Sequence, residues 1–320
     1  MTDTTITRRK DFLSVLDFEP ADLERCLQLA TQLKADRALG RHAPTADALD
    51  GRHVALLFDK PSLRTRTTFE IAIRELGGHL VPLQPDVALG RREPVADVAR
   101  NLERWVDAIV IRTFSQPLLR EFAGAATRLH VVNALTDLEH PCQAIADVLT
   151  LQERLGPLRG RTIAYVGDGN NVATSLAHAA AMLGLHVHVA SPESHQLPHA
   201  VVQQATHVAR HGARLRLFSE AADAVAGADA VYTDTWTSMG QEGEADARRK
   251  IFAPYQVNED LMALAMPGAL FMHCLPAHRG EEVTAEVFES DASVVFDQAE
   301  NRLHGQKALL LMLLTPAAKL

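Results

Sequence analysis

Cysteine is scarce in this sequence, with three residues, Cys26, Cys142 and Cys274, among 320. Their number is odd and they lie far apart, so they form neither a disulfide framework nor the short spacings of a metal site. A disulfide-stabilised secreted domain is therefore excluded, and we expect a reduced, cytoplasmic protein.

Long apolar runs and an excess of basic residues are also missing. No apolar run approaches the roughly 20 residues that span a bilayer. The opening segment, MTDTTITRRK, has no apolar stretch behind its charges, so we expect no signal peptide. The 32 Lys and Arg residues are outnumbered by 40 Asp and Glu residues, which gives a formal net charge of -8. We therefore expect no membrane and no nucleic-acid partner.

What the chain does contain is the material of a large core. Hydrophobic residues make up 47% of 320 residues, which suits one large or two medium domains. Short apolar runs alternate with helical periodicity almost throughout. Such alternation is typical of parallel sheets covered by helices on both faces. The series is interrupted near residues 140–160, so we predict two α/β domains.

The apolar runs predict the individual strands. In the first half they are His53–Phe58, Leu80–Leu83, Ala108–Ile111 and Val131–Val132. In the second half they are Thr162–Val166, Val187–Ala190, Leu215–Phe218, Ala230–Tyr232, Leu270–Met272 and Val294–Phe296. Helices are predicted from about Thr67 to Leu76, from Pro94 onward and from about Pro141 to Leu155. The polar stretch Thr233–Pro254 is the least regular, and we interpret it as a functional loop.

Ligands of doubly wound sheets bind at the carboxyl ends of the strands, so the segments that follow the strands are the candidate sites. The first is Ser62–Thr67 (SLRTRT), which follows a strand and opens a helix. Free N–H groups at a helix start attract anions, and hydroxyls with two arginines would complete a phosphate cradle. An N-cap serine beside solvated arginines explains the same residues, and this segment alone does not decide between the two.

A glycine-rich turn, Gly167–Val172 (GDGNNV), follows the predicted strand Thr162–Val166. It resembles a dinucleotide-binding fingerprint, but Val172 stands where the third glycine belongs, which disfavours a nucleotide cofactor. Two other interpretations remain open. The turn is either a plain strand-to-helix connection or a place where an asparagine side chain holds a substrate carboxylate.

The segment Asp234–Gly240 (DTWTSMG) follows another strand. It offers a carboxylate, hydroxyls and backbone groups together, an inventory that suits the ammonium and carboxylate groups of an amino acid. An Asx-turn with a capping serine is the alternative.

The segment His273–Pro276 (HCLP) also follows a strand. Cys274 there can act as a nucleophile, as a thiolate base or as an inert core residue. A zinc site built from His273, Cys274 and His278 would lack a fourth ligand and a recognised spacing.

Two candidates come from the first half of the chain. His140–Gln143 (HPCQ) lies at a proline-initiated helix start, where His and Gln could donate hydrogen bonds to a carbonyl or amide, or cap the helix. Arg112 directly follows a predicted strand, but an arginine in that place is often a plain surface residue.

Taken together, SLRTR, HPCQ, GDGNN, DTWTSMG, HCLP and AENRLH resemble the transcarbamoylase family, and most closely its ornithine branch. The six motifs occur in the family's order and approximate spacing, from about Asp11 to Leu314. The resemblance implies transfer of the carbamoyl group of carbamoyl phosphate to the δ-amine of L-ornithine, giving L-citrulline and phosphate in arginine metabolism. It also implies a homotrimer or a multiple of trimers, and no cofactor or metal.

The family's fold implies two doubly wound parallel-sheet domains. Residues 1–145 form the carbamoyl-phosphate domain, and residues 146–297 form the ornithine domain. The C-terminal helix, from about 298 to 320, packs back on the N-terminal domain.

The resemblance also carries site residues, position by position. Catalytic roles fall on Cys274, Arg112 and His140. The carbamoyl-phosphate contacts are Ser62, Leu63, Arg64, Thr65, Arg112, His140, Pro141, Cys142, Gln143, Cys274, Leu275 and Arg302. The ornithine contacts are Asn171, Asp234, Ser238 and Met239.

Two departures from the family's pattern affect the phosphate side. Leu63 replaces a threonine of the usual Ser-Thr-Arg-Thr-Arg motif, so one hydroxyl is lost while its backbone N–H remains. Ala88 stands about where the family often has a glutamine that reaches a neighbouring subunit's site, and Gln84 is out of register.

Four alternative functions remain to be weighed. An acetyl- or succinylornithine carbamoyltransferase would share SLRTR and HPCQ, but the intact DTWTSMG favours a free α-ammonium group. An aspartate carbamoyltransferase would need cations for a second carboxylate where this chain offers Asp234. A nicotinamide dehydrogenase would rest on GDGNN alone. A non-catalytic homologue would explain Leu63 and Ala88 but not the retained Arg64, Arg112 and Cys274.

Overall fold

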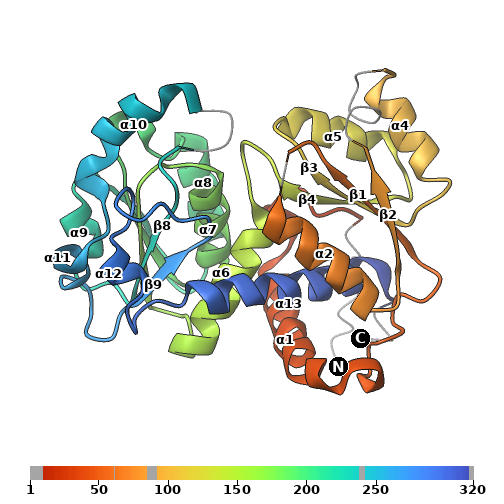
Figure 1. Cartoon of the computed structure of the whole chain (residues 1–320), viewed down its shortest axis with the longest axis horizontal. Coiled ribbons are helices and arrows are strands. Elements are labelled where there is room, and N and C mark those ends of the chain that lie inside the picture. Colours follow the sequence, from red (N-terminus) through yellow and green to blue (C-terminus); the bar gives the residue numbers. More distant parts are fainter. Residues whose placement is uncertain (1–9, 61, 85–91, 238–241, 317–320) are drawn as a thin grey trace. The chain divides into compact units, whose positions relative to one another are not determined.

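The computed structural model describes residues 10–60, 62–84, 92–237 and 242–316, and the chain forms two compact units. Unit 1 comprises Met1–Ile145 and Arg302–Leu320, and unit 2 comprises Ala146–Asn301. Both division points fall inside helices, α6 (Pro141–Leu155) and α13 (Val295–Leu314), so each of these helices contributes to both units (Figure 1).

Within the described residues, unit 1 contains a four-stranded parallel sheet with the order β2-β1-β3-β4. The strands are β1 (His53–Phe58), β2 (His79–Leu83), β3 (Ala108–Arg112) and β4 (His130–Leu135). The helices are η1 (Val15–Asp17), α1 (Pro20–Asp36), η2 (Arg37–His42), α2 (Leu63–Glu75), α4 (Val95–Leu102) and α5 (Gln116–Ala125).

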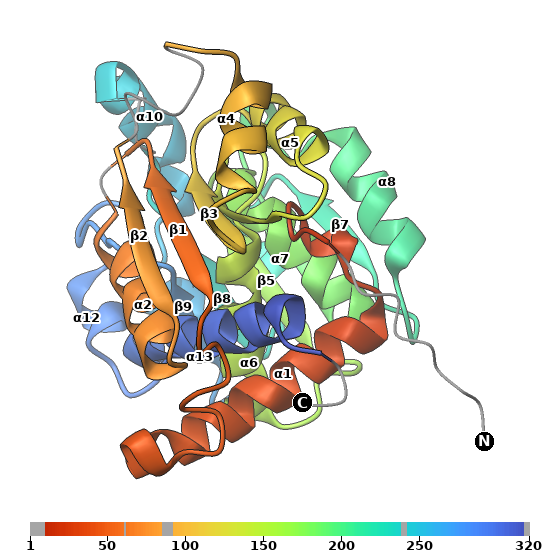
Figure 2. The same cartoon turned by 90° about the vertical axis from the view of Figure 1, so that its right-hand side faces the viewer.

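The strands of unit 1 are short apolar runs because both faces of the sheet are covered. Alternate side chains such as Ala55, Leu57 and Ile109 pack with α4 and α5 in one core cluster. Helix α2 and the C-terminal part of α13 lie on the opposite face, as Figures 1 and 2 show. Helix α2 ends at Glu75 with Leu76 as its C-cap, and the next residue, Gly77, has φ +80°, the left-handed conformation that glycine adopts without steric cost.

Among its described residues, unit 2 contains a five-stranded parallel sheet with the order β7-β6-β5-β8-β9. The strands are β5 (Thr162–Val166), β6 (His186–Ala190), β7 (Leu215–Phe218), β8 (Ala230–Thr233) and β9 (Leu270–His273). The helices are α7 (Asn171–Met182), η3 (Glu193–His195), α8 (His199–Val208), α9 (Ala221–Val225), η4 (Glu242–Glu244), α10 (Ala245–Phe252), η5 (Ala253–Tyr255), α11 (Glu259–Met262) and α12 (Ala285–Phe288).

The core of unit 2 follows the same logic. One face of its sheet packs against α9 to α12 in a cluster that includes Val166, Val231 and Phe271. Helix α7 is apolar almost all round, and its residues from Val172 to Met182 are buried, as expected for a helix enclosed by the domain. The predicted fold class, α/β with two doubly wound parallel sheets, is confirmed.

The C-terminal helix also packs on unit 1 as predicted. From Arg302 onward α13 belongs to unit 1, where Arg302 donates to Thr65 and Lys307 donates to Glu75. The helix begins at Val295, slightly earlier than the predicted start near residue 298.

The strand predicted at Val294–Phe296 is wrong. The chain makes a single bridge beside β9, in which Phe271 N–H donates to Ala292 O (2.8 Å) and Val294 N–H donates to Phe271 O (3.0 Å). It then enters α13 at Val295. The error arises because a short apolar run reads the same in a buried strand and in the first turn of a buried helix.

The interpretation of Thr233–Pro254 as an irregular loop is also wrong in part, because the segment contains η4, α10 and the start of η5. Helix α10 buries Arg248 and Phe252. The Arg248 guanidinium donates to the Asp168 carboxylate and to Trp236 O. Because a paired arginine occupies a position where an apolar residue would mark the inner face, hydrophobic periodicity could not reveal this helix.

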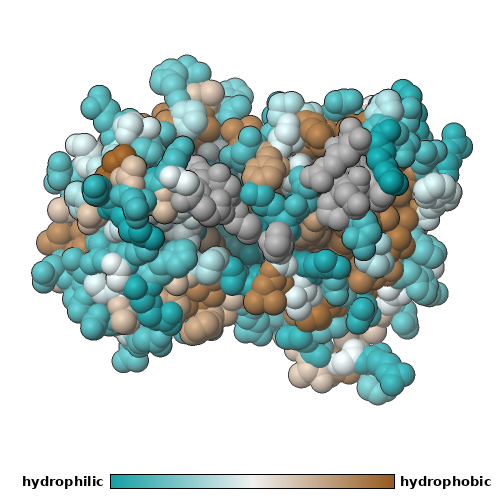
Figure 3. Space-filling view, turned by 45° about the horizontal axis from the view of Figure 1, so that its top comes forward, coloured by the Kyte–Doolittle hydropathy of each residue, from teal (hydrophilic) through white to brown (hydrophobic). Residues whose placement is uncertain are grey.

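The molecular surface mixes polar and apolar residues. Apolar side chains on the face drawn in Figure 3 are interspersed among hydrophilic ones. No helix among the described residues is both long enough and apolar enough to cross a membrane.

Candidate active site

Each unit has a topological switch point, where successive connections leave the sheet in opposite directions. In unit 1 it lies between β1 and β3, and in unit 2 between β5 and β8. Ligands of such sheets bind at the carboxyl ends of the strands that flank this point. The polar motifs found in the sequence follow these strands and their neighbours.

In unit 1, Ser62 links the helix start after β1 to Arg112 at the end of β3. Ser62 is the N-cap residue of α2, yet its side chain makes no capping hydrogen bond and instead accepts one from Arg112 Nη1 (3.2 Å). The first-turn N–H groups of a helix have no intrahelical acceptor, so this helix start can bind an anion. A hydroxyl, a guanidinium and a helix N-terminus thus converge.

A β-bulge re-aims the end of β3. Ile111 pairs with Asn133 on β4, whereas Arg112 pairs with Leu135, so the register shifts by one residue between them. Bulges bend a strand locally and are common beside active sites, where they redirect a side chain.

Arg302 joins three helices of the chain within unit 1. This residue of α13 is 2% exposed, and its guanidinium donates to Thr65 Oγ1 (2.6 Å) and to Gln143 Oε1. The predicted phosphate-side residues Thr65, Gln143 and Arg302 are therefore in direct contact.

His140 lies among the cations of unit 1. Burial lowers the pKa of His140 well below its ordinary value, and the positive charges of Arg302, Arg112 and Arg64 lower it further. The imidazole is therefore neutral near pH 7, so it can donate one hydrogen bond without adding a fourth positive charge.

A buried polar network holds the residue that precedes the HPCQ segment. Ser14 Oγ donates to Glu139 Oε1, and Thr136 Oγ1 donates to Gln116 Oε1 (2.6 Å) while accepting from Glu139 N–H (3.2 Å). This network was not predictable from local sequence patterns, because Ser14 and Glu139 are 125 positions apart. Its effect is to fix the residue that immediately precedes His140.

The side chains of the HPCQ segment have different surroundings. Pro141 is the first residue of α6. The Cys142 thiol is buried and donates to Asn133 O (3.3 Å), and burial raises its pKa to about 12. This thiol stays protonated at neutral pH and cannot act as a nucleophile.

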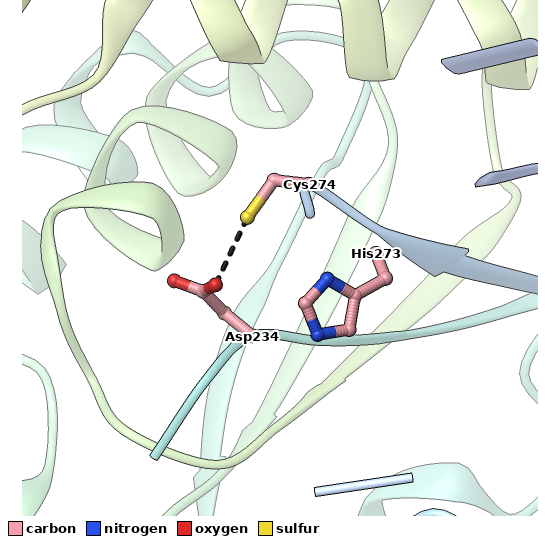
Figure 4. Close-up of side chains that lie close together, drawn as sticks. All are labelled: Asp234, His273 and Cys274. Atoms are coloured by element: carbon pink, nitrogen blue, oxygen red, sulfur yellow. Dashed lines mark hydrogen bonds between the residues drawn. The ribbon is translucent and has the colours of Figure 1, made fainter. Parts of the chain in front are cut away.

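In unit 2, Asp234 is the centre of the arrangement. It is 8% exposed and follows β8 directly. Its carboxylate accepts hydrogen bonds from Cys274 Sγ (3.0 Å), from Thr235 N–H (2.8 Å) and from Asn170 Nδ2 (2.8 Å). Figure 4 shows the contact between Cys274 and Asp234. Three donors therefore hold this buried carboxylate in place.

Asn170 is a site residue that the sequence reasoning missed. Its Oδ1 accepts from Val172 N–H (2.9 Å), Ala173 N–H (3.2 Å) and Tyr165 OH (3.2 Å), so it caps α7 while its amide nitrogen holds Asp234. The strong N-cap preference of asparagine was the available signal. Asn171, predicted to contact ornithine, is the first residue of α7 and is half-buried.

Gly169 explains why the turn after β5 resembles a nucleotide fingerprint without being suited to one. A Cβ at Gly169 would lie 2.5 Å from Leu197 N and 2.7 Å from His195 O. The second glycine of a dinucleotide motif lets the backbone approach a pyrophosphate, whereas here that side is occupied by the protein's own backbone. The dinucleotide interpretation is therefore disfavoured by the structure as well.

Gly169→Ala is expected to destabilise the protein, because the new methyl group meets backbone atoms that cannot rotate away. The cost of such overpacking is about 1–3 kcal/mol, measured as the free energy of unfolding in urea. Gly124→Ala on α5 is the matched control, since its Cβ would meet nothing within 4 Å. Equal stability of the two variants would contradict the packing described for Gly169.

The HCLP segment has a strained backbone. Leu275 adopts φ +61°, a left-handed conformation that costs a bulky residue about 1–3 kcal/mol. Its N–H donates to His273 Nδ1 (2.8 Å), and His273 Nε2 contacts Glu282 Oε1 (3.1 Å). Strain of this kind persists only where surrounding contacts impose it, and such places cluster at functional sites.

Metal binding has two candidate clusters among the described residues, Asp234 with His273 and Cys274, and His278 with Glu281 and Glu282. In the first, both nitrogens of His273 already have protein partners. In the second, Glu281 is paired with Arg249 (3.0 Å). In the first cluster a metal ion would have to displace one of these contacts, and in the second it would compete with Arg249 for Glu281.

Comparison with known proteins gives the family. The model for the carbamoyl-P binding domain of aspartate/ornithine carbamoyltransferase matches residues 10–153. The model for the Asp/Orn binding domain matches residues 159–313. The chain belongs to the aspartate/ornithine carbamoyltransferase family.

Relatives within the carbamoyltransferase family match almost the whole chain. The ornithine carbamoyltransferase of Anoxybacillus flavithermus is 48% identical over 317 residues, which cover 98% of this chain and 99% of the relative. That of Acidothermus cellulolyticus is 52% identical, over 96% of this chain and 97% of the relative.

Solved carbamoyltransferase structures agree. The enzyme from Pyrococcus furiosus has a TM-score of 0.90 and 46% identity, covering 95% of this chain and 96% of its own. The ornithine carbamoyltransferase from Thermus thermophilus has a TM-score of 0.85 and 44% identity, covering 96% and 99%.

Some residues predicted from the carbamoyltransferase motifs are not placed by the structure. Ser238 and Met239 lie outside the described residues, as does Ala88. Leu63, the departure from the family motif, is the first residue of α2 and is 77% exposed, so its side chain is free of the buried Arg302 contacts.

Proposed function

We propose that this protein transfers the carbamoyl group of carbamoyl phosphate to the δ-amine of L-ornithine, giving L-citrulline and phosphate in arginine metabolism. One observation carries the proposal, namely that the two units offer opposite charges. Unit 1 gathers Arg64, Arg112 and Arg302 around the neutral His140, which suits an anionic phosphate. Unit 2 presents the buried carboxylate of Asp234, which suits a cationic amino acid.

The phosphate of carbamoyl phosphate binds at the start of α2 in this proposal. Ser62, Arg64, Thr65 and the backbone N–H of Leu63 contact its oxygens. Charge-assisted hydrogen bonds from arginine to phosphate are short and strong. Arg302 holds Thr65 (2.6 Å) and adds positive charge. As carbon–oxygen cleavage proceeds, these groups stabilise the departing phosphate.

The carbamoyl group lies against Arg112 and the segment His140–Gln143, where Pro141 and Cys142 contribute backbone and shape. Arg112 and His140 donate to the carbonyl oxygen, on which negative charge grows as the amine attacks. Because the pKa of His140 is held well below its ordinary value, the imidazole acts as a neutral donor across the physiological pH range.

Ornithine binds in unit 2. Asn171 contacts its carboxylate, Asp234, Ser238 and Met239 contact the rest of the amino acid, and Cys274 with Leu275 lies where the two substrates react. The δ-amine titrates near 10.4 in its free form, so binding must favour the neutral amine. Nearby positive charge has this effect because it disfavours the protonated form.

The reaction is a direct transfer. The amine nitrogen bonds to the carbonyl carbon, the bond from that carbon to the phosphate oxygen breaks, and the proton that the amine releases passes to the departing phosphate. No covalent intermediate on Cys274 is required. Cys274 contributes by holding the Asp234 carboxylate in place near the amine through its hydrogen bond.

Cys274→Ala is expected to lower kcat roughly tenfold, because a hydrogen bond to the charged Asp234 is worth about 1.5–3 kcal/mol and part of it is replaced by water. Residual turnover is expected, since no covalent step is lost. Cys26→Ala, a buried cysteine on α1, is the control for thiol loss outside the site. Unchanged turnover in Cys274→Ala would remove this residue from the mechanism.

One assay tests the function itself. Purified protein is mixed with carbamoyl phosphate and L-ornithine, and citrulline is measured. Turnover of acetylornithine, succinylornithine or aspartate in place of ornithine would overturn the proposal, and absence of turnover with all four would indicate a non-catalytic homologue.

We further propose a homotrimer or multiple of trimers, without cofactor or metal, in the cytoplasm. The family resemblance supports the assembly, and three cysteines that form no disulfide support the reducing compartment. Sedimentation equilibrium tests the trimer, and full citrulline production after dialysis against EDTA is the expected result for a metal-free enzyme.

A further inference from the structure

Glu282 is a buried carboxylate that the proposed mechanism does not use. It is 0% exposed and lies in the turn that follows HCLP. Its Oε1 accepts from His278 N–H (2.6 Å) and contacts His273 Nε2 (3.1 Å). Its Oε2 has no hydrogen-bond partner among the described residues and lies 3.7 Å from His278 Nδ1. Burying a carboxylate costs free energy unless it is paired and hydrogen-bonded. The partners of Glu282 therefore indicate what this buried group does.

The contacts of His273 determine its tautomer. Leu275 N–H donates to Nδ1 (2.8 Å), so Nδ1 carries a lone pair and the ring proton is on Nε2. That Nε2–H then donates to Glu282 Oε1, which can only accept. The carboxylate, the imidazole and the Leu275 backbone therefore form one directed chain of hydrogen bonds.

Two members of this hydrogen-bond chain, His273 and Leu275, are the residues immediately before and after Cys274. His273 is the last residue of β9 and is 0% exposed, and Leu275 has its strained φ of +61°. Fixing the residues before and after Cys274 fixes the direction of its side chain. In that direction Sγ meets Asp234 Oδ1 at 3.0 Å (Figure 4).

We propose that Glu282 and His273 are positioning residues for the reaction. Glu282 holds the Nε2–H tautomer of His273, and His273 anchors Leu275 N–H so that Cys274 faces Asp234. The proposal rests on the proposed function, because that function gives Cys274 and Asp234 their role. According to this proposal, turnover depends on the position of the Glu282 oxygen that accepts from His273 and not on the charge of Glu282.

Two variants of the same residue separate geometry from charge. Glu282→Gln loses the charge, but its amide oxygen still reaches His273 Nε2 and His278 N–H. Glu282→Asp keeps the charge but is one methylene shorter, so it cannot make both contacts. We expect Glu282→Gln to retain kcat within about threefold, and Glu282→Asp to lose roughly tenfold to a hundredfold, since misplacing a reacting group by about 1 Å has that effect.

The matched control is Glu281→Asp. Its neighbouring carboxylate pairs with Arg249 (3.0 Å) and does not touch His273. We expect wild-type kcat from it. In all three variants a loss of folding would instead reduce the active fraction and the melting temperature.

A direct readout of the tautomer is independent of activity. Long-range proton–nitrogen NMR of protein labelled with ¹⁵N-histidine distinguishes Nε2–H from Nδ1–H imidazole, and His273→Asn identifies the signals. We expect Nε2–H in the wild type and in Glu282→Gln, and a changed pattern in Glu282→Asp.

The outcomes are separable. Nδ1–H or imidazolium in the wild-type protein would overturn the proposal even if Glu282→Asp failed to fold. Equal losses in Glu282→Gln and Glu282→Asp would also overturn it, because charge would then be the cause. Absence of citrulline from the wild type with a confirmed Nε2–H tautomer would count against the proposed function and leave the hydrogen-bond chain intact.

Discussion

Asp234→Asn is expected to lower kcat/KM for ornithine by roughly 30-fold or more. The carboxylate is 8% exposed and already has three protein donors, so its charge is held where water cannot replace it. Losing one partner of a buried charged hydrogen bond costs about 2 kcal/mol or more, which corresponds to this factor. Asparagine keeps the shape and removes the charge, so the effect reports recognition of the cationic group.

Steady-state kinetics with ornithine varied at saturating carbamoyl phosphate measure the effect. Asp246→Asn is the matched control, because that carboxylate lies on α10, is 92% exposed and pairs with Arg249. An Asp234→Asn enzyme with wild-type kcat/KM for ornithine would refute the placement of the amino acid in unit 2.

Arg112→Met should slow turnover on the order of 10²- to 10³-fold in kcat, because it removes a donor from the oxygen on which charge develops. The loss of one such donor typically raises the barrier by about 3 kcal/mol. Methionine retains much of the arginine's volume, so the fold is preserved while the hydrogen bond to Ser62 Oγ (3.2 Å) disappears.

Arg112→Met also has a spectroscopic consequence at His140. Arg112 is one of three cations that lower the pKa of His140, so removing it should raise that pKa. The pKa should still remain below the ordinary value because burial is the largest cause.

Arg100→Met on α4, with its side chain 63% exposed, is the control for loss of a positive charge. If kcat fell equally in both variants, general electrostatics rather than the carbonyl contact would explain the loss.

Much of the fold was predictable because buried parallel strands consist of continuous apolar runs. The strand Thr162–Val166 and the helix Pro141–Leu155 have the predicted bounds, since apolar composition, a proline start and a glycine stop agree there. Where hydropathy was ambiguous or silent, prediction failed. Val294–Phe296 is too short to distinguish a strand from a helix, and α10 has a paired arginine on its inner face.

The site was predictable to the extent that its residues follow strands. Arg112, Asp234 and Cys274 were found this way, and their roles remain predictions. Residues that support the site through buried hydrogen bonds were not found, because their partners are distant in sequence. Ser14 contacts Glu139 across 125 positions, and nothing local to either residue indicates it.

The course of α13 has a consequence for synthesis of the chain on the ribosome. Thr65 and Gln143 are made early, but Arg302, which holds them both, belongs to the last segment to emerge. At about 5–20 residues per second, the intervening residues take on the order of ten seconds or more to appear. Unit 1 therefore acquires Arg302 only when the last part of the chain has been made. Premature termination shortly before Arg302 would leave Thr65 and Gln143 without this contact.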